Sequence, residues 1–95
     1  EVIDLRTLSP WDKECIINSV KRTRRALVFH EDGITCGFGA EIASTIAKEC
    51  FMYLDAPVDR IAVKDIPIPY DVELMDHVVP TVQEVSNKVL EILNY

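Results

Sequence analysis

Apolar residues along this chain alternate between a strand-like and a helix-like spacing. Three short segments are rich in β-branched and apolar residues, which favours strands: residues 1–6, 26–30 and 58–63. Three longer segments place apolar residues every three or four positions, which predicts helices: residues 10–25, 38–51 and 81–93. This order implies a mainly parallel sheet with helices on both faces. The pattern therefore predicts a three-layer α/β/α domain spanning residues 1–95.

Two helix starts carry capping signals. Ser9 before Pro10 predicts an N-cap at Ser9 with proline at the first helical position. Thr81 with Glu84 three residues later predicts a capping box. Between the last strand and the last helix, two prolines in residues 65–70 predict an extended loop.

The charge balance limits the class of partner. The chain has 95 residues, 16 of them acidic and 10 basic, and a net charge of −6. This charge disfavours nucleic acid, whose binding depends on neutralising phosphates. It suits a basic protein partner, or it only keeps the domain soluble. The basic run 21–25 falls where cations favour a helix C-terminus, although an anion-binding patch is the alternative.

The cysteines indicate a reducing compartment. Cys15, Cys36 and Cys50 are odd in number and widely spaced, and only His30 and His77 could complete a zinc site. Cys15 and Cys50 fall in helical patterns and are expected in the core. The chain opens in strand-like residues without a leader or a membrane-length apolar run. We expect a soluble piece of a longer protein.

Two glycines before the second helix invite a phosphate-binding interpretation. Gly37 and Gly39 would let backbone N–H groups approach an anion. A dinucleotide motif needs a third glycine, however, and that position holds Ile42. We favour the alternative that Gly39 lets the helix start close against a neighbouring backbone.

The candidate catalytic residues are His30, Glu31 and Cys36. His30 and Glu31 lie at the end of the second strand, where ligands bind in open parallel sheets. Cys36 precedes the second helix, and a helix N-terminus lowers the pKa of a thiol. Sequence does not show that His30 reaches Cys36, so a thiol-dependent or ligand-binding module stays an alternative. His77 lies in an apolar stretch and is expected to be packed rather than a ligand. No complete active site is recognisable, so no catalytic, cofactor-binding or metal-binding residue is assigned.

Six segments, in order along nearly the whole chain, match one pattern: Val2-Ile3-Asp4-Leu5-Arg6-Thr7-Leu8, Pro10-Trp11-Asp12, His30-Glu31, Gly37-Phe38-Gly39-Ala40-Glu41-Ile42, Leu54-Asp55-Ala56-Pro57 and Pro67-Ile68-Pro69-Tyr70. Together they resemble the C-terminal, transketolase-type domain of the beta subunit of the thiamine diphosphate-dependent decarboxylase of 2-oxo acid dehydrogenase complexes. Cys36 stands where that family usually has the first glycine of Gly-Gly-Phe-Gly-Ala-Glu, which weakens a catalytic role for it.

Further segments resemble the branched-chain (2-oxoisovalerate) type more than the pyruvate or acetoin type. They are Pro10-Trp11-Asp12, Ser44-Thr45-Ile46 with Glu49-Cys50-Phe51, and the ending Asn94-Tyr95. The resemblance implies a parent enzyme that decarboxylates a 2-oxo acid on thiamine diphosphate and transfers the acyl group to lipoyl. It places thiamine diphosphate and Mg²⁺ outside this chain, and it implies no activity for this chain alone.

The resemblance also implies partners. The domain pairs beta subunits, accompanies an alpha subunit and binds the small, basic peripheral subunit-binding domain of the acyltransferase core. Tyr95, at the C-terminus, belongs to that docking region in relatives. The expected location is a bacterial cytoplasm or the mitochondrial matrix, with neither a membrane nor a nucleic acid as partner.

In the family fold a further strand lies inside the sheet, between the strands represented here by residues 2–5 and 26–30. This chain lacks that strand-helix unit, which would leave unpaired backbone groups in a sheet interior. We therefore expect a domain that is marginally stable alone, or one in which another segment supplies the strand.

Overall fold

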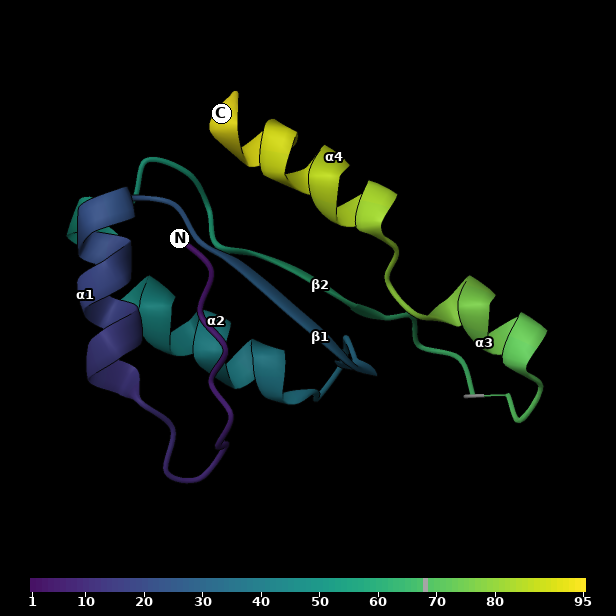
Figure 1. The fold of residues 1–95 in the computed structure, drawn as a ribbon. Helices are drawn as coiled ribbons and strands as arrows, with labels where there is room; N and C mark the ends of the chain where they lie inside the picture. The colour runs from purple at the N-terminus through teal and green to yellow at the C-terminus, as the bar shows by residue number, and fades with distance from the viewer. Residues whose placement is uncertain (68) are drawn as a thin grey trace.

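The computed structural model describes residues 1–67 and 69–95, so Ile68 of the predicted proline loop lies outside the described residues. The elements follow in chain order (Figure 1): α1 (Lys13–Thr23), β1 (Leu27–Gly33), α2 (Phe38–Glu49), the 3-10 turn η1 (Phe51–Tyr53), β2 (Asp59–Val63), α3 (Val72–Val78) and α4 (Val82–Leu93). The predicted alternation of strands and helices is confirmed for five of these elements.

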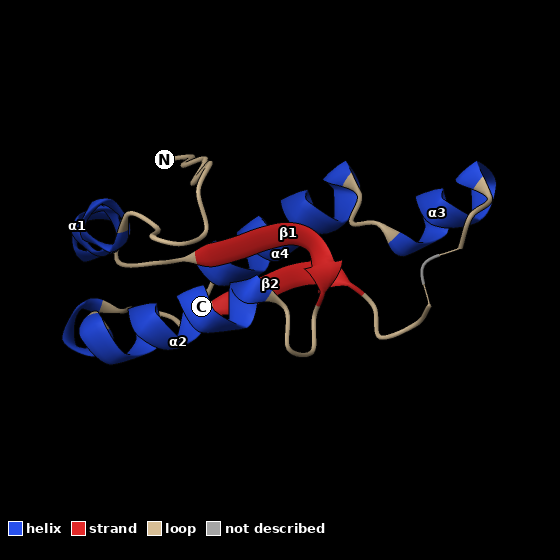
Figure 2. Ribbon diagram, turned by 90° about the horizontal axis from the view of Figure 1, so that it is seen from below, coloured by secondary structure: helices blue, strands red, loops and turns tan. Residues whose placement is uncertain are grey.

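The two strands form a parallel sheet between two helical layers. Leu27 lies opposite Asp59 and Phe29 lies opposite Ile61. α1 and α2 lie on one side of the sheet and α4 on the other, while α3 lies beyond the carboxyl ends of the strands (Figures 1 and 2). The predicted α/β class with a parallel sheet is confirmed, although the described residues form a sheet of only two strands.

Residues 1–6 do not form the predicted strand. Ile3 and Leu5 are partly buried, whereas Val2, Asp4 and Arg6 are exposed, so the side chains keep the two-residue alternation of a strand. Ile3 and Leu5 also pack against the core. Among the described residues, the segment nonetheless pairs with neither β1 nor β2. The alternation of apolar and polar side chains is present, but a strand also requires a hydrogen-bonding partner strand.

The start of α1 differs from the prediction. The N-cap is Asp12, whose carboxylate accepts a hydrogen bond from the Cys15 amide at 3.1 Å, and Ser9 lies in the preceding turn. Asp is as strong an N-cap as Ser. With the helix beginning at Lys13, Ile16 faces the core and Cys15 is exposed. The expectation that Cys15 is a core residue is therefore wrong.

The basic end of α1 makes structural ion pairs. Arg24 closes the helix in the left-handed conformation, with φ 67°. Its guanidinium donates two hydrogen bonds of 2.9 Å to the Asp55 carboxylate, and these lower the pKa of Asp55. Arg25 also lies 3.8 Å from Asp55 and donates to the carbonyl oxygen of Ile92 in α4. These contacts favour the structural interpretation of the basic run.

Near the C-terminus, α3 was not predicted from the sequence, whereas the prediction of α4 is confirmed. α3 begins at Asp71, whose side chain accepts a hydrogen bond from the Glu73 amide at 2.9 Å. His77 is exposed in its last turn, so the expected packed histidine is wrong; Val78 is the buried residue instead. The α4 cap is confirmed, because Thr81 Oγ1 accepts from the Glu84 amide at 3.2 Å.

The main core lies between α1, α2 and the sheet. Its buried members are aliphatic or sulfur-containing: Ile16, Val20, Ile42, Ile46 and Cys50. Trp11 closes one end of this core, with its ring edge-on to Phe38 at 6.4 Å between centroids. On the other side, α3 and α4 bury one residue each, Val78 and Ile92. The second helical layer is therefore much more thinly packed than the first.

Among the described residues, no helix has the length and apolar character needed to cross a membrane.

Candidate functional site

His30 occupies the region where a ligand was expected, but its role is packing against α2. It lies in the middle of β1, because the strand continues to Gly33 instead of ending at His30 as predicted. A Cβ added at Gly39 would collide with the imidazole, and one added at Gly37 would lie 2.9 Å from its Cε1 atom. The ring therefore fills the space that Gly39 leaves, whereas a Cβ at Gly37 would first meet the backbone carbonyl oxygen of Gly33. This confirms that Gly39 allows a close approach, although the neighbour it meets is a side chain.

The glycine pair offers no sign of a phosphate loop. Gly37 is the N-cap of α2 with φ −73°, and none of the glycines has a positive φ. Both glycines are buried. Glycine is needed because a side chain would have no room there, and not because the backbone conformation is unusual. At Gly39 the imidazole of His30 already occupies that room. An anion would have to displace the ring of His30.

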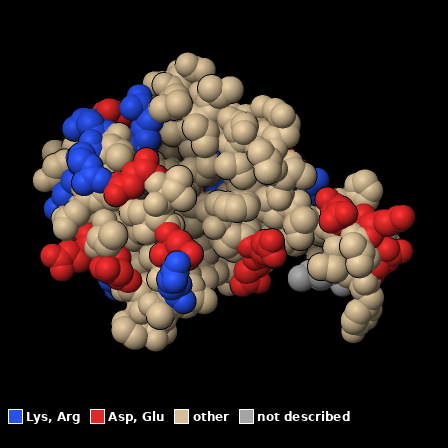
Figure 3. Space-filling model, in the orientation of Figure 1, with Lys and Arg blue, Asp and Glu red and all other residues tan. Residues whose placement is uncertain are grey.

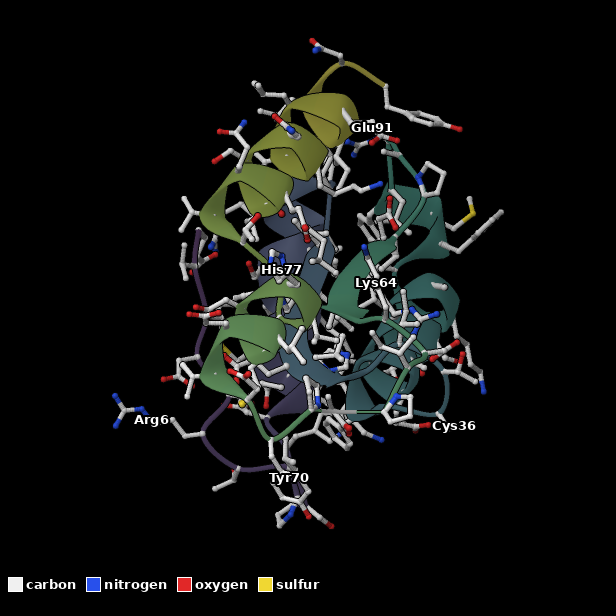
Figure 4. All side chains as sticks on the ribbon, turned by 90° about the vertical axis from the view of Figure 1, so that its right-hand side faces the viewer. Arg6, Cys36, Lys64, Tyr70, His77 and Glu91 are labelled. Atoms are coloured by element: carbon white, nitrogen blue, oxygen red, sulfur yellow. The ribbon has the colours of Figure 1, made fainter. Side chains whose placement is uncertain are left out.

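The three candidate catalytic residues do not form one site. Glu31 and Cys36 are exposed, and Cys36 lies at the periphery of the molecule (Figure 4). Cys36 lines a shallow depression with Asp32 and Glu41, whereas His30 lines a separate cavity. In the part of the chain that the structure describes, no three His, Cys, Asp or Glu side chains gather as metal ligands. The structure does not assemble a thiol–imidazole pair.

Cys36 has a backbone conformation that favours glycine. Its φ is 62°, in the left-handed region that non-glycine residues adopt at a penalty of about 1–2 kcal/mol. This strain gives a physical reason for the glycine that related sequences were expected to carry at this position.

We predict that Cys36→Gly raises the free energy of unfolding by about 1 kcal/mol, because glycine relieves the left-handed strain. Urea denaturation followed by circular dichroism measures the change. Cys15→Gly is the matched control: it removes an exposed thiol from within α1 and should lower stability by about 1 kcal/mol. A destabilised Cys36→Gly variant would show that the thiol makes a contact of its own.

Cys50 is a structural thiol. It is fully buried, and its Sγ lies 3.8 Å from the carbonyl oxygen of Ile17. Burial raises the pKa of the thiol, which disfavours the reactive thiolate. The expectation that Cys50 is a core residue is confirmed.

α4 and the residues that follow it carry exposed apolar side chains that a partner could cover. We call this set the C-terminal surface, defined by Val82, Val89, Leu90, Leu93 and Tyr95. Val82 is 85% exposed, Leu93 57% and Tyr95 73%. The periodicity predicted one apolar face for this helix, yet only Ile92 of the helix is buried. Figure 3 shows few charged side chains over α4 on the face in view.

The C-terminal surface belongs to the most acidic part of the sequence. Residues 65–95 contain six carboxylates and a single lysine, so they carry nearly all of the net charge of −6. That lysine, Lys88, is held at 3.1 Å from both Asp59 and Glu91, and these contacts raise its pKa. In Figure 3 a group of red carboxylates marks the α3 end of the molecule. The C-terminal third thus combines exposed aliphatic side chains with negative charge.

Comparison with known proteins gives consistent matches. Residues 1–85 match the family described as "Transketolase, C-terminal domain". The chain is 45% identical over 95 residues to 2-oxoisovalerate dehydrogenase subunit beta 2, mitochondrial, of Arabidopsis thaliana. It is 46% identical over 95 residues to pyruvate dehydrogenase E1 component subunit beta of Rickettsia conorii. It is also 49% identical over 70 residues to 2-oxoisovalerate dehydrogenase subunit beta of Pseudomonas aeruginosa.

These matches cover much more of this chain than of its relatives. The first two include 100% of the chain and the third 74%, but they include only 26%, 29% and 20% of the relatives. The chain thus spans about a quarter of the length of the relatives it matches end to end. The family match, however, covers most of the chain and agrees with the parallel α/β fold. The chain therefore belongs to the transketolase C-terminal domain family.

Proposed function

We propose that this chain is the C-terminal pairing and docking domain of a 2-oxo acid dehydrogenase beta subunit. The parent enzyme would decarboxylate a 2-oxo acid with thiamine diphosphate and pass the acyl group to lipoyl. The single observation that carries the docking role is the C-terminal surface, whose exposed apolar residues belong to the acidic last third of the chain. The names of the relatives, beta subunits of pyruvate and 2-oxoisovalerate dehydrogenases, support the assignment to such a parent.

The chemistry of the C-terminal surface fits a small basic protein. Protein interfaces combine an apolar centre with a polar rim, and α4 carries exposed apolar residues together with the exposed carboxylates of Glu84 and Glu91. Excess negative charge would steer a basic partner towards it. The peripheral subunit-binding domain of an acyltransferase core has the size and charge required. A second beta subunit and an alpha subunit would then cover other faces.

For the substrate we favour a branched-chain 2-oxo acid. The sequence segments around Trp11, Ser44 and Asn94 are similar to that type. Relatives of the pyruvate and 2-oxoisovalerate types match at nearly equal identity, so the preference rests on those segments. The parent would work in a bacterial cytoplasm or in the mitochondrial matrix.

We place thiamine diphosphate and Mg²⁺ on other parts of the parent enzyme. The only glycine pair that could approach a diphosphate is filled by the ring of His30. Glu31 and Cys36 are exposed, and neither hydrogen-bonds to the ring nitrogens of His30. The thiol-dependent alternative consequently has little geometric support.

Calorimetric binding of this chain to an isolated peripheral subunit-binding domain tests the docking role. We expect binding that weakens by about tenfold between 50 and 500 mM salt, since screening shortens the reach of surface charges. Leu93→Asp should weaken it at least tenfold, and Tyr95→Ala several-fold, because both remove apolar contact area.

Met52→Asp is the matched control for Leu93→Asp. Met52 is 84% exposed in η1, so the variant adds the same charge at an exposed apolar position away from α4. It should bind within twofold of the unmodified chain. Absent binding, binding insensitive to salt, or equal losses for the two variants would each contradict docking through the C-terminal surface.

A further inference from the structure

The face of α4 that packs on the rest of the domain is not its most apolar face. Val82, Val89 and Leu93 are spaced by seven and four positions, so they share one stripe of the helix, and all three are exposed. The stripe that packs consists of three partly or fully buried residues: Val85, Lys88 and Ile92. A charged side chain therefore occupies a packed position, while an aliphatic stripe beside it faces solvent.

Apolar burial alone would favour another rotation of α4. Successive residues lie about 100° apart around an α-helix, so a turn of that size would exchange Lys88 for Val89. The same turn would exchange Ile92 for Leu93. It would pack three aliphatic residues of α4 instead of two, and it would place the Lys88 ammonium in solvent. A polar contact must therefore favour the observed rotation.

That contact is an ion pair between α4 and the sheet. The Lys88 ammonium lies 3.1 Å from the carboxylate of Asp59, the first residue of β2. The Asp59 carboxylate also accepts a hydrogen bond from the Arg60 amide at 2.8 Å, so the sheet holds it in place. The Lys88 side chain is only 29% exposed, and a partly buried ammonium needs a charged partner. A turn of α4 would carry the ammonium away from this fixed carboxylate.

A second contact anchors the end of α4. The Arg25 side chain donates a hydrogen bond from Nε to the carbonyl oxygen of Ile92 at 3.1 Å. Helix carbonyl groups point along the helix axis, and those of the last turn lack partners within the helix. This bond therefore holds the end of α4 on the domain without deciding which side chains face the sheet. That choice is left to Asp59.

We propose that Asp59 is a positioning residue for the C-terminal surface. Through its ion pair with Lys88, it selects the rotation of α4 that turns the aliphatic stripe outwards. Asp59 acts through the orientation of the helix, and it needs no contact with the partner. The inference rests on the proposed docking function, because an outward stripe serves docking only if a basic partner binds there.

Methyl exposure measures the rotation of α4 directly. A soluble paramagnetic agent is added to the whole methyl-labelled chain, and NMR relaxation shows which methyl groups it reaches. In the unmodified chain we expect the methyl signals of Val89 and Leu93 to relax faster than those of Val85. Asp59→Asn removes the charge and keeps an acceptor for the neighbouring amide. In this variant we expect the order to reverse, with Val89 and Leu93 becoming the protected residues.

Glu91→Gln is the matched control for methyl exposure. Glu91 is the other carboxylate in contact with Lys88, also at 3.1 Å, but it lies on α4 and turns with it. The order of exposure should therefore stay as in the unmodified chain. Exchanging the two charges, with Asp59→Lys and Lys88→Asp in one chain, should restore the order that Asp59→Asn reverses.

Calorimetry with the peripheral subunit-binding domain is the second readout. Asp59→Asn should weaken binding about tenfold, because α4 no longer presents its aliphatic stripe. Glu14→Gln removes the same charge from an exposed position on α1, so it should weaken binding by less than about twofold.

The two readouts separate failure of this inference from failure of the docking function. An unchanged order of methyl exposure in Asp59→Asn would overturn the positioning role. Exposure of Val85 together with Val89 would show that α4 detaches instead of turning, and it would also overturn that role. A reversed order with unaltered binding would support the positioning of α4 by Asp59 and contradict docking through the C-terminal surface.

Discussion

Gly39→Ala is expected to lower the free energy of unfolding by about 2–3 kcal/mol, which is the usual effect of overpacking a filled interior. The added methyl group would collide with the imidazole of His30, and Gly39 is buried. Neither the ring nor the helix backbone can move away without disturbing the packing of β1 against α2. Urea denaturation followed by circular dichroism gives the free energy.

The collision partner makes a rescue experiment possible. Replacing His30 with alanine removes the atoms that Gly39→Ala meets, so the double variant should recover about 1–2 kcal/mol relative to the sum of the single changes. Gly37→Ala should show a smaller recovery, because its new Cβ also meets the backbone carbonyl oxygen of Gly33. His30→Ala cannot remove that clash.

Gly33→Ala is the matched control. Its nearest neighbour would be the carbonyl oxygen of Thr35 at 3.6 Å, which is ordinary contact, and its φ is not positive. Its stability should change by less than about 0.5 kcal/mol. Two results would show that the imidazole of His30 is not the reason for glycine at position 39. One is an equal loss of stability for Gly33→Ala and Gly39→Ala, and the other is no energetic coupling between Gly39 and His30.

The periodic parts of the sequence predicted the fold well. A short apolar run predicted β1, and helical spacing predicted α2 and α4, because these signals come from burial on a face that exists in the folded chain. Parallel pairing followed from the alternation of strands and helices, and β1 and β2 show it. Local capping rules also placed the start of α4 at Thr81.

Features that depend on a neighbour were not predictable from local pattern. Residues 1–6 have strand-like alternation but no strand beside them. α3 was not predicted because it is short and mostly exposed, so its sequence lacks the apolar periodicity of a helix with a buried face. Its N-cap residue Asp71 was the only signal for it. The prediction that His77 is packed assumed a core at this helix, but α3 leaves His77 exposed.

The candidate site shows the same limit. His30 and Gly39 are nine positions apart, and nothing in the sequence shows that one fills the space left by the other. The apolar face of α4 was evident from Val82, Val89 and Leu93, but the pattern implied burial within the domain. The spacing of apolar residues along a helix shows that one face is apolar. It does not show whether the rest of the chain or a partner protein covers that face.

Ile46→Ala is expected to lower the free energy of unfolding by about 2–5 kcal/mol, through lost apolar burial and the cavity left behind. Ile46 is 2% exposed at the centre of the main core, where it lies with Val20 and Cys50. Because α3 and α4 bury only one residue each, we expect the free energy of unfolding of the unmodified chain to be on the order of 5 kcal/mol, the lower end for single domains. The variant should therefore be partly unfolded without denaturant.

Denaturation curves against Val82→Ala check this expectation. Val82 is 85% exposed, so that control should change stability by less than about 0.5 kcal/mol. A loss below 1 kcal/mol for Ile46→Ala would show that the core relaxes around the missing atoms.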